Sequence, residues 1–277
     1  MEHPEPGRRL IVNADDFGRS NSINQAVIRA HQEGILTSAS LMVNEPEFNE
    51  AVVLARQNPR LGVGLHLTLV CGMSTLRPND IPGLVDDSGK FSDHPVRAGI
   101  RYFFHGRLRP FLRREMAAQF QKFQQTGLRL DHVNGHLHLH LHPTVFSILR
   151  HHGREWGVKH FRLTRDRFWL NARLASGNWC YRLSHAIIYS LLARHVRPSL
   201  KVQRVRHTTA VFGLLQSGRV TESYLMKLLP RLPAGDSELY SHPSLDEFKD
   251  EFDALVSPRV KRLAEDCGIR LIRYQDL

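Results

Sequence analysis

Residues Leu10–Gly18 read L-I-V-N-A-D-D-F-G, and this stretch decides the fold that we expect. Apolar residues run almost directly into two adjacent carboxylates, Asp15 and Asp16, and then into Phe17-Gly18. A short apolar run that ends at a turn signal is typical of a buried strand, so the carboxylates lie where the strand stops. In a parallel α/β fold, residues at the carboxyl ends of the strands face the functional site. Two neighbouring carboxylates are costly to ionise together unless a positive group lies beside them, which predicts a divalent metal here.

Strand-like and helix-like segments alternate along most of the chain, which indicates parallel βα units. After the first strand we expect strands at Ser38–Val43, Leu61–Leu69, Leu130–Leu139, His160–Leu163, His207–Phe212, Ser237–Tyr240 and Ile269–Ile272. The expected helices are Ser22–Glu33, Glu47–Gln57, Phe111–Gln125, Thr144–Trp156, Thr221–Leu229 and Leu245–Cys267. This pattern favours an α/β fold of the (β/α) TIM-like barrel type, or a distorted relative of it, with a doubly wound open sheet as second choice.

We expect a single domain over residues 1–277, because barrels of about 250 residues commonly fold as one unit. Residues 70–110 are rich in proline and glycine and predict a long loop excursion. Residues 178–197 predict an amphipathic helix that carries Trp and Tyr and is flanked by arginines. Such a helix either packs on the core or lies on a membrane or an apolar substrate, and both interpretations stay open.

The chain is basic, with 38 Lys and Arg against 27 Asp and Glu and a formal charge of +11. This charge suggests an anionic neighbour, either nucleic acid or a membrane face, although basic residues can also merely keep an enzyme in solution. No zinc-finger or RRM signature is present, so we expect no nucleic-acid partner. A non-catalytic lipid- or nucleic-acid-binding protein is the rival interpretation.

The chain also indicates a compartment. The cysteines, Cys71, Cys180 and Cys267, are odd in number and far apart, which gives no disulfide framework and fits a reducing environment. The first residues lack the apolar region of a signal peptide, and no run of apolar residues is long enough to cross a membrane. We therefore expect a cytoplasmic protein, with peripheral contact to the inner membrane face as an extension of that expectation.

Two later strands carry histidine. His66 lies near the end of G-V-G-L-H-L-T-L at Gly62–Leu69, where it is either a core residue or a ligand. In D-H-V-N-G-H-L-H-L-H-L-H-P, four histidines alternate with leucines: His136, His138, His140 and His142. Because strand side chains alternate between faces, these imidazoles would share one face. Metal binding by one or two of them is the economical interpretation, and a polar face on a half-buried strand is the other.

Carboxylates and imidazoles from three strands make a mixed N/O site, which suits Zn²⁺ or another first-row divalent ion. Such a site lowers the pKa of a bound water and polarises a carbonyl, while a carboxylate that is not a ligand can take a proton. The segment S-E-L-Y-S-H-P at Ser237–Pro243 ends another strand in His242. This histidine either protonates a leaving group or caps a turn before proline.

The motifs N-A-D-D-F-G, G-L-H-L-T-L, G-H-L-H-L-H and E-L-Y-S-H-P together resemble the YdjC-like carbohydrate deacetylases, the family of the chitooligosaccharide deacetylase. The resemblance runs from about Leu10 to Tyr274, with the motifs in order. The segment H-T-T-A-V-F-G-L-L-Q-S-G is most similar to the hopanoid-biosynthesis-associated branch. The resemblance implies a barrel-like fold, a divalent metal with Zn²⁺ ahead of Mg²⁺, and hydrolysis of the N-acetyl group of an N-acetylglucosamine-type sugar, with a hopanoid lipid as its carrier in that branch.

By motif position, the resemblance implies that Asp16, His66 and His136 are the metal ligands. It also implies that Asp15 is the general base and that His242 is the acid.

One departure from the family pattern concerns the residue two places before the ligand histidine. The family usually reads Asp-Ser-His there, whereas this chain has Asn134-Gly135-His136, which puts any orienting role of that Asp in doubt. Three other functions compete: a soluble chitooligosaccharide deacetylase, the binding protein, and a glycosidase that uses both adjacent carboxylates. Glycosidase carboxylates stand about 5 Å or more apart across the bond, which neighbours on a strand do not readily achieve.

Overall fold

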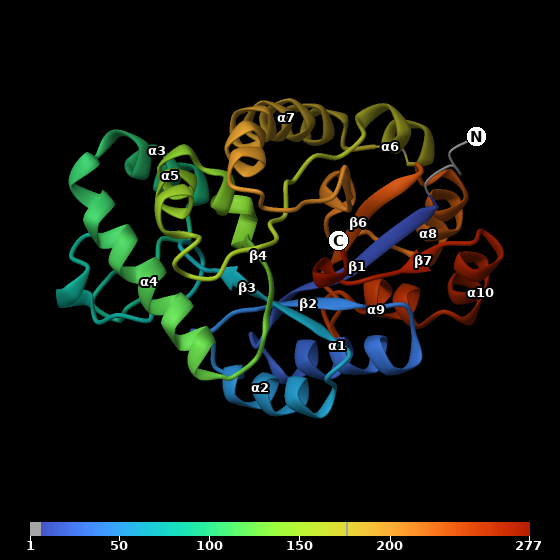
Figure 1. The fold of residues 1–277 in the computed structure, drawn as a ribbon, viewed down its shortest axis with the longest axis horizontal. Helices are drawn as coiled ribbons and strands as arrows, with labels where there is room; N and C mark the ends of the chain where they lie inside the picture. The colour runs from blue at the N-terminus through green and yellow to red at the C-terminus, as the bar shows by residue number, and fades with distance from the viewer. Residues whose placement is uncertain (1–6, 176) are drawn as a thin grey trace.

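The computed structural model describes residues 7–175 and 177–277, and a parallel sheet curled into a distorted barrel lies at its centre (Figure 1). Within these residues the strand order is β4-β3-β2-β1-β6-β5, with β7 beside the start of β1. The strands are β1 (Arg8–Phe17), β2 (Ser38–Leu41), β3 (Gly62–Leu67), β4 (Leu130–Gly135), β5 (Ala210–Phe212), β6 (Gly235–Ser241) and β7 (Arg270–Leu271).

The segment 159–165 runs between the edge strands β4 and β5. Val133 of β4 forms a parallel bridge with Phe161, and His160 forms another with Arg206, which precedes β5. Farther along, the Val211 N–H of β5 donates to the Arg165 carbonyl at 3.0 Å. The expected strand at His160–Leu163 is therefore present only as isolated bridges, and these bridges join the two edges of the sheet. The prediction of an α/β fold with a distorted TIM-like barrel is confirmed.

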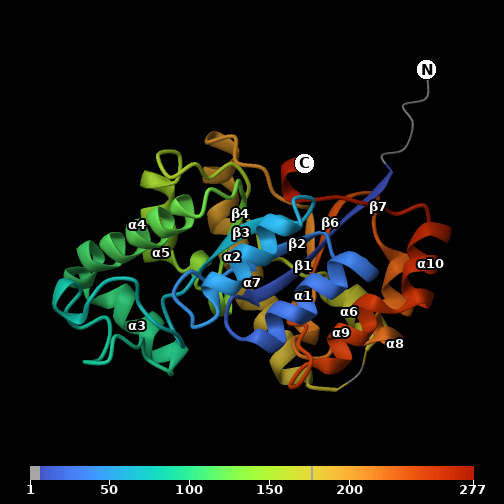
Figure 2. The ribbon, with the colours of Figure 1, turned by 90° about the horizontal axis from the view of Figure 1, so that it is seen from below.

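Helices surround the barrel, with α1, α2 and α9 along one side and α7 along the opposite side (Figure 1). Figure 2 shows α3 and the loops around it at one end of the molecule. The helices are α1 (Asn21–Glu33), α2 (Phe48–Gln57), α3 (Pro95–Phe104), α4 (Arg109–Gln125), α5 (Pro143–His152), α6 (Phe168–Leu174), α7 (Trp179–Val202), α8 (Glu222–Leu228), α9 (Lys249–Val256) and α10 (Pro258–Asp266). None of the helices in the described ranges combines the length and the apolar character that a membrane crossing requires.

Strand β1 sits at the middle of the sheet, which explains its continuous apolar run. Leu10, Ile11 and Val12 are fully buried, as expected for a parallel strand covered on both faces. After the strand, the Ser20 side chain accepts a hydrogen bond from the Ile23 N–H and caps the start of α1. The start of the chain thus folds as the first βα unit that its sequence predicts.

Three helical expectations need correction. The long helix expected at Leu245–Cys267 is two helices, because Pro258 cannot continue α9 and instead begins α10 under a cap from Ser257. The excursion at residues 70–110 contains α3 as well as loops, and α6 is a helix that the sequence pattern did not indicate. The amphipathic helix expected at 178–197 extends to Val202.

The strand expected at Leu130–Leu139 is also wrong in its second half. Strand β4 ends at Gly135, and a tight 3₁₀ segment follows from His136 to Leu141. Leu137 and His138 in this segment have φ of 50° and 57°, in the left-handed region. The four alternating histidines therefore do not line one face of a strand, and each lies in a different environment.

Candidate metal centre and active site

The carboxyl ends of β1, β3 and β4 bring together the three residues expected as metal ligands. Asp16 Oδ1 lies 2.9 Å from His136 Nδ1 and 3.2 Å from His66 Nε2. One ligand atom from each residue lies within 4.8 Å of the other two, and all three side chains are buried. A carboxylate with two imidazoles is a donor set that first-row divalent ions accept.

The orientation of His66 is fixed by Asn134. The His66 Nδ1 atom lies 2.7 Å from Asn134 Oδ1, and because an amide oxygen only accepts, Nδ1 carries the proton. In the neutral ring the lone pair of Nε2 then faces the Asp16 carboxylate. The His66 Nε2 lone pair and Asp16 Oδ1 are both acceptors and lie 3.2 Å apart, so they repel each other unless a proton or a cation lies between them. The residues present therefore fit a metal ion.

The backbone at this rim is strained. Asp16 has φ of 64°, in the left-handed region that residues other than glycine rarely adopt. Such outliers persist where the surrounding structure holds them, and they concentrate at functional sites. Arg19 supports the side chain, since its Nη1 donates to Asp16 Oδ2 at 2.8 Å. Burial acts to raise the pKa of Asp16, but His136 and His66 outweigh it and hold the pKa well below its usual range.

Asp15 lies in a polar network that Asn134 links to His66. The Arg162 guanidinium donates to both of its oxygens, at 2.6 Å and 3.0 Å. The side-chain amides of Asn13 and Asn134 donate to Oδ1 at 2.9 Å and 3.0 Å. Burial raises the pKa of this carboxyl, but Arg162 and then His66 outweigh it, so the pKa lies far below its ordinary value and Asp15 is ionised.

Arg162 is a site residue that sequence reasoning missed. Its side chain is fully buried, and besides Asp15 it binds Glu238 of β6 at 2.7–2.8 Å. The Tyr274 hydroxyl donates to the other oxygen of Glu238. The available signal was an arginine inside an apolar run, H-F-R-L, which the strand pattern at His160–Leu163 already contained. A charge in a buried stretch requires a partner, and Arg162 has two, Asp15 and Glu238.

Asn134, which stands where the resemblance leads us to expect Asp, contacts three polar side chains. Its amide nitrogen donates to Asp15 Oδ1 and to Ser40 Oγ, while its oxygen accepts the His66 proton. An ionised carboxylate at position 134 would have no N–H to donate to Asp15 Oδ1 and would repel its negative charge. The asparagine thus contacts both His66 and Asp15.

These residues open into one cavity of about 380 Å³. Asp15, His66, His136 and His242 all line it, so the residue expected as the acid shares the space with the candidate metal site. The backbone N–H of His242 donates to Glu251 Oε2 at 2.6 Å, and its Nδ1 lies 4.0 Å from the same oxygen. The remaining wall is largely apolar and comes from α3, the turn after β4, and α7: Val96, Leu137, Tyr181, Ile188 and Tyr189.

The other histidines of the His-Leu alternation lie in different environments, and His138 also lines the cavity. The His138 Nε2 lies 2.9 Å from the Tyr240 hydroxyl, and the His140 Nε2 lies 3.0 Å from the Arg162 carbonyl. Burial lowers the pKa of His138 well below its usual value and that of His140 to about 3, so both rings are neutral. His142 packs its edge on the Tyr102 ring.

The parallel barrel and the carboxylate with two imidazoles at its strand ends define an α/β barrel protein with a candidate site for a divalent metal. A family model described as "YdjC-like protein" matches residues 9–266, and the chain belongs to this family. The family membership expected from the four motifs is thereby confirmed.

Known relatives cover part of the chain. The chain is 41% identical over 153 residues to a carbohydrate deacetylase of Brevibacillus brevis. The matched region is 54% of this chain and 57% of that protein. The chain is also 42% identical over 143 residues to a carbohydrate deacetylase of Geobacillus stearothermophilus, covering 51% and 54%. The chain thus spans just over half the length of the curated relatives it matches.

A solved structure resembles the chain over nearly its whole length. This crystal structure, of a candidate cellobiose-phosphate cleavage protein from Enterococcus faecalis, has a TM-score of 0.74, 24% identity and 98% coverage of both chains. At this identity the likeness establishes the fold alone.

Proposed function

We propose that the chain is a metal-dependent deacetylase that hydrolyses the N-acetyl group of an N-acetylglucosamine-type sugar. The observation that carries the proposal is one cavity lined by Asp15, His242 and the His66–His136 pair that contacts Asp16. The names of the curated relatives support a carbohydrate substrate. We also infer one deacetylase domain over residues 1–277, because β7 near the end of the chain pairs with β1 near its start.

Asp16, His66 and His136 would hold the metal. Two nitrogens and one oxygen favour Zn²⁺, and Mg²⁺, which prefers oxygen ligands, is the second choice. A divalent ion in such a site lowers the pKa of a water molecule and polarises the acetyl carbonyl.

Asp15 acts as the general base and takes a proton from the attacking water. Arg162 and the two asparagine amides fix the carboxylate in place and keep it ionised. The same contacts make it a weak base, so it suits a water that is already strongly polarised. Positioning by fixed donors lowers the reorganisation that the proton transfer requires.

His242 acts as the acid and protonates the departing amine. As the amide C–N bond breaks, the nitrogen takes the proton from the imidazole and leaves as the free amine, with acetate as the other product. The contacts of Glu251 with the His242 backbone and ring hold the imidazole at the cavity.

The apolar wall supports a finer proposal, which is that the sugar arrives on an apolar carrier such as a hopanoid lipid. Val96 of α3 and Ile188 of α7 line the cavity and are 75% and 50% exposed. Exposed apolar side chains at a cavity mouth are typical of surfaces that contact an apolar ligand. A protein with this wall and a basic surface would work in the cytoplasm, at the inner membrane face. Co-sedimentation with anionic liposomes tests this contact, and the absence of salt-sensitive binding would count against it.

The experiment combines elemental analysis of the purified protein with acetate assays. We expect a divalent metal, acetate release from an N-acetylglucosaminyl lipid, and loss of release after chelation with recovery when the metal returns. Chitobiose is assayed as a second substrate, and acetate release from chitobiose but not from the lipid would identify a soluble chitooligosaccharide deacetylase. A shortened sugar without acetate would identify a glycosidase, and a function that survives chelation would favour the binding protein.

A further inference from the structure

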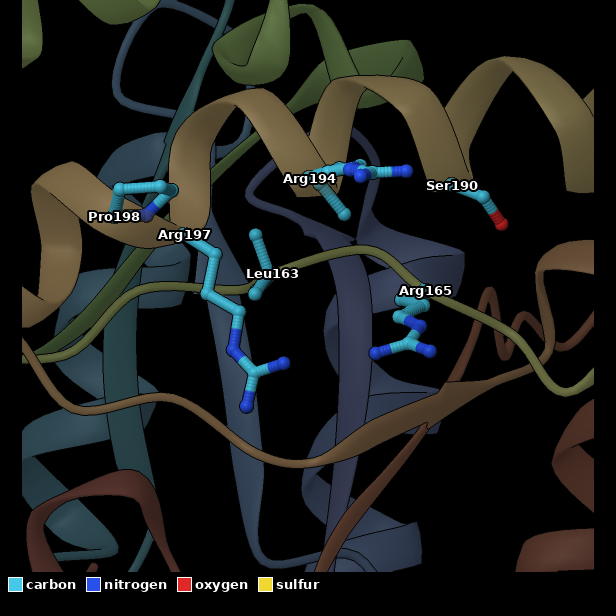
Figure 3. Close-up of a pocket in the computed structure, with 7 residues that line it drawn as sticks. Leu163, Arg165, Ser190, Arg194, Arg197 and Pro198 are labelled. Atoms are coloured by element: carbon cyan, nitrogen blue, oxygen red, sulfur yellow. The ribbon is translucent and has the colours of Figure 1, made fainter.

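Helix α7 separates two cavities. Tyr181, His185 and Ile188 on one flank line the candidate active site. The other flank, together with the segment that joins β4 and β5, encloses a second cavity of about 500 Å³. Arg165, Arg194 and Arg197 line this cavity with Ser190, Leu163 and Ala193, and we call it the arginine cavity. Figure 3 shows Arg165 and Arg197 extending into the space beneath the helix and Arg194 lying along the helix towards Ser190.

Among the residues that the structure describes, the positive charge of the arginine cavity has no protein counter-ion. Within residues 7–175 and 177–277, none of its three guanidinium groups forms an ion pair or hydrogen bond, and no carboxylate lines the cavity. The buried arginines behave differently, since all three guanidinium nitrogens of Arg162 and of Arg182 donate to protein acceptors. Three like charges around one hollow repel each other, and an anion in that hollow relieves the repulsion.

Asp166, the residue after Arg165, does not neutralise these arginines. Asp166 lies in an adjoining cavity of about 470 Å³, which shares Arg165 and Ser190 with the arginine cavity. Its side chain is buried, and its Oδ2 accepts the Leu215 N–H at 3.2 Å. Burial raises the pKa of Asp166 to about 7, which reduces its negative charge at neutral pH.

We propose that the arginine cavity binds the phosphate group of a phosphorylated ligand. Planar guanidinium groups match phosphate oxygens in paired hydrogen bonds, and the Ser190 hydroxyl adds a neutral donor. The volume suits a ligand larger than inorganic phosphate, with Leu163 and Ala193 as the surface for its carbon skeleton. The phosphate belongs either to a soluble phosphate ester or to a phospholipid headgroup. The site is independent of the proposed hydrolysis, because it lies on the other flank of α7.

Calorimetric titration with pyrophosphate at constant ionic strength tests the site. The Arg165→Gln/Arg197→Gln double variant removes two guanidinium groups of the cavity. Both residues are exposed, so the fold is retained. We expect the Kd of pyrophosphate to rise about a hundredfold, roughly tenfold for each lost guanidinium. The matched control is Arg113→Gln/Arg262→Gln, which removes the same charge from α4 and α10 and leaves the Kd unchanged. Arg194→Gln is a second variant in the cavity, with an expected rise of about tenfold.

A second arm identifies the source of the phosphate. Vesicles of equal parts phosphatidylcholine and phosphatidylglycerol are sedimented with the wild type and with both double variants. Binding that the cavity variant loses and pyrophosphate displaces assigns the site to a phospholipid headgroup. Pyrophosphate binding without vesicle binding assigns it to a soluble phosphate ester. Equal affinity of the wild type and the cavity variant for both probes, or equal weakening by the control variant, would overturn the proposal.

Discussion

The floor of the candidate-site cavity consists of strand ends with buried, hydrogen-bonded polar side chains, whereas its wall consists largely of helices with exposed apolar side chains. On the floor, Asp15 and His66 are 2% and 1% exposed, and Asp16, which contacts His66 from behind the lining, is 4% exposed. In the wall, Val96 and Ile188 are 75% and 50% exposed. The floor has a fixed geometry before any ligand arrives, as acid-base and metal chemistry require. The wall exposes apolar surface to solvent, which favours contact with an apolar part of the substrate that does not take part in the reaction.

The largest effect is expected from a ligand of the floor. His66→Ala removes one of three donors from the candidate metal site, so the purified variant should lose both its metal and its acetate release. His185→Ala is the matched control, because His185 lines the same cavity from α7 and should keep the metal. Elemental analysis and the acetate assay measure both. A full metal complement in His66→Ala would refute the assignment of His66 as a ligand.

A smaller loss is expected when only proton transfer is removed. Asp15→Asn should lower kcat by about 10²–10⁴-fold, the usual contribution of a general base, and leave the metal in place. The variant leaves Arg162 paired with Glu238, so the protein should remain folded, which a thermal melt checks. Retained turnover in a folded variant would remove Asp15 from the mechanism.

Two asparagines on the floor allow a matched comparison. Both donate to Asp15 and Ser40, but only Asn134 accepts the His66 proton. Asn134→Ala should therefore weaken metal affinity by about 10–100-fold, as loss of a partner that orients a ligand does, while Asn13→Ala should leave it nearly unchanged. Metal titration of both variants decides. Equal losses would mean that the contact to Asp15, and not the one to His66, controls metal affinity.

The smallest effect is expected in the wall. Ile188→Ser should raise KM for a lipid-linked sugar about five- to tenfold and leave kcat unchanged, because it removes binding that is the same in the ground and transition states. Ile187→Ser changes the neighbouring, similarly exposed residue, which does not line the cavity, and should leave KM unchanged. Steady-state kinetics of both variants on the lipid-linked sugar and on chitobiose measure these KM values. An equal rise for chitobiose would assign the wall to the sugar instead of its carrier.

The sequence predicts the floor better than the wall, for physical reasons. The apolar run of β1 and the strand-helix alternation are local patterns that a parallel barrel requires, so the fold and the rim with Asp15 and Asp16 could be predicted. The His-Leu alternation has the period of a strand, but left-handed backbone at Leu137 and His138 turns the chain, and residue preferences do not encode that turn. Arg162 was missed because its partner, Asp15, lies 147 residues away in the chain.

The wall could not be predicted because helix packing decides it. Residues 70–110 look like a loop from their prolines, yet Pro95 begins a helix, as proline commonly does at a first turn. For the 178–197 helix, packing on the core is confirmed by the buried Ala193 and Val196. Ile187 and Leu191 are exposed, and contact of this face with a membrane or an apolar substrate stays a prediction. Which flank of α7 lines a cavity depends on its rotation, and that rotation is a tertiary property.

The side chain of Arg162 has a consequence for how activity arises during folding. It originates in the segment that bridges the two sheet edges, and it binds Asp15 of β1 and Glu238 of β6. Until those edges meet, Asp15 lacks the guanidinium that orients it, so in an open form of the chain the carboxylate that we propose as the base is not held in place. Renaturation followed by enzyme assay and by tryptophan fluorescence should then give one shared time constant for the last step. Competence for hydrolysis would be the final property that the molecule acquires.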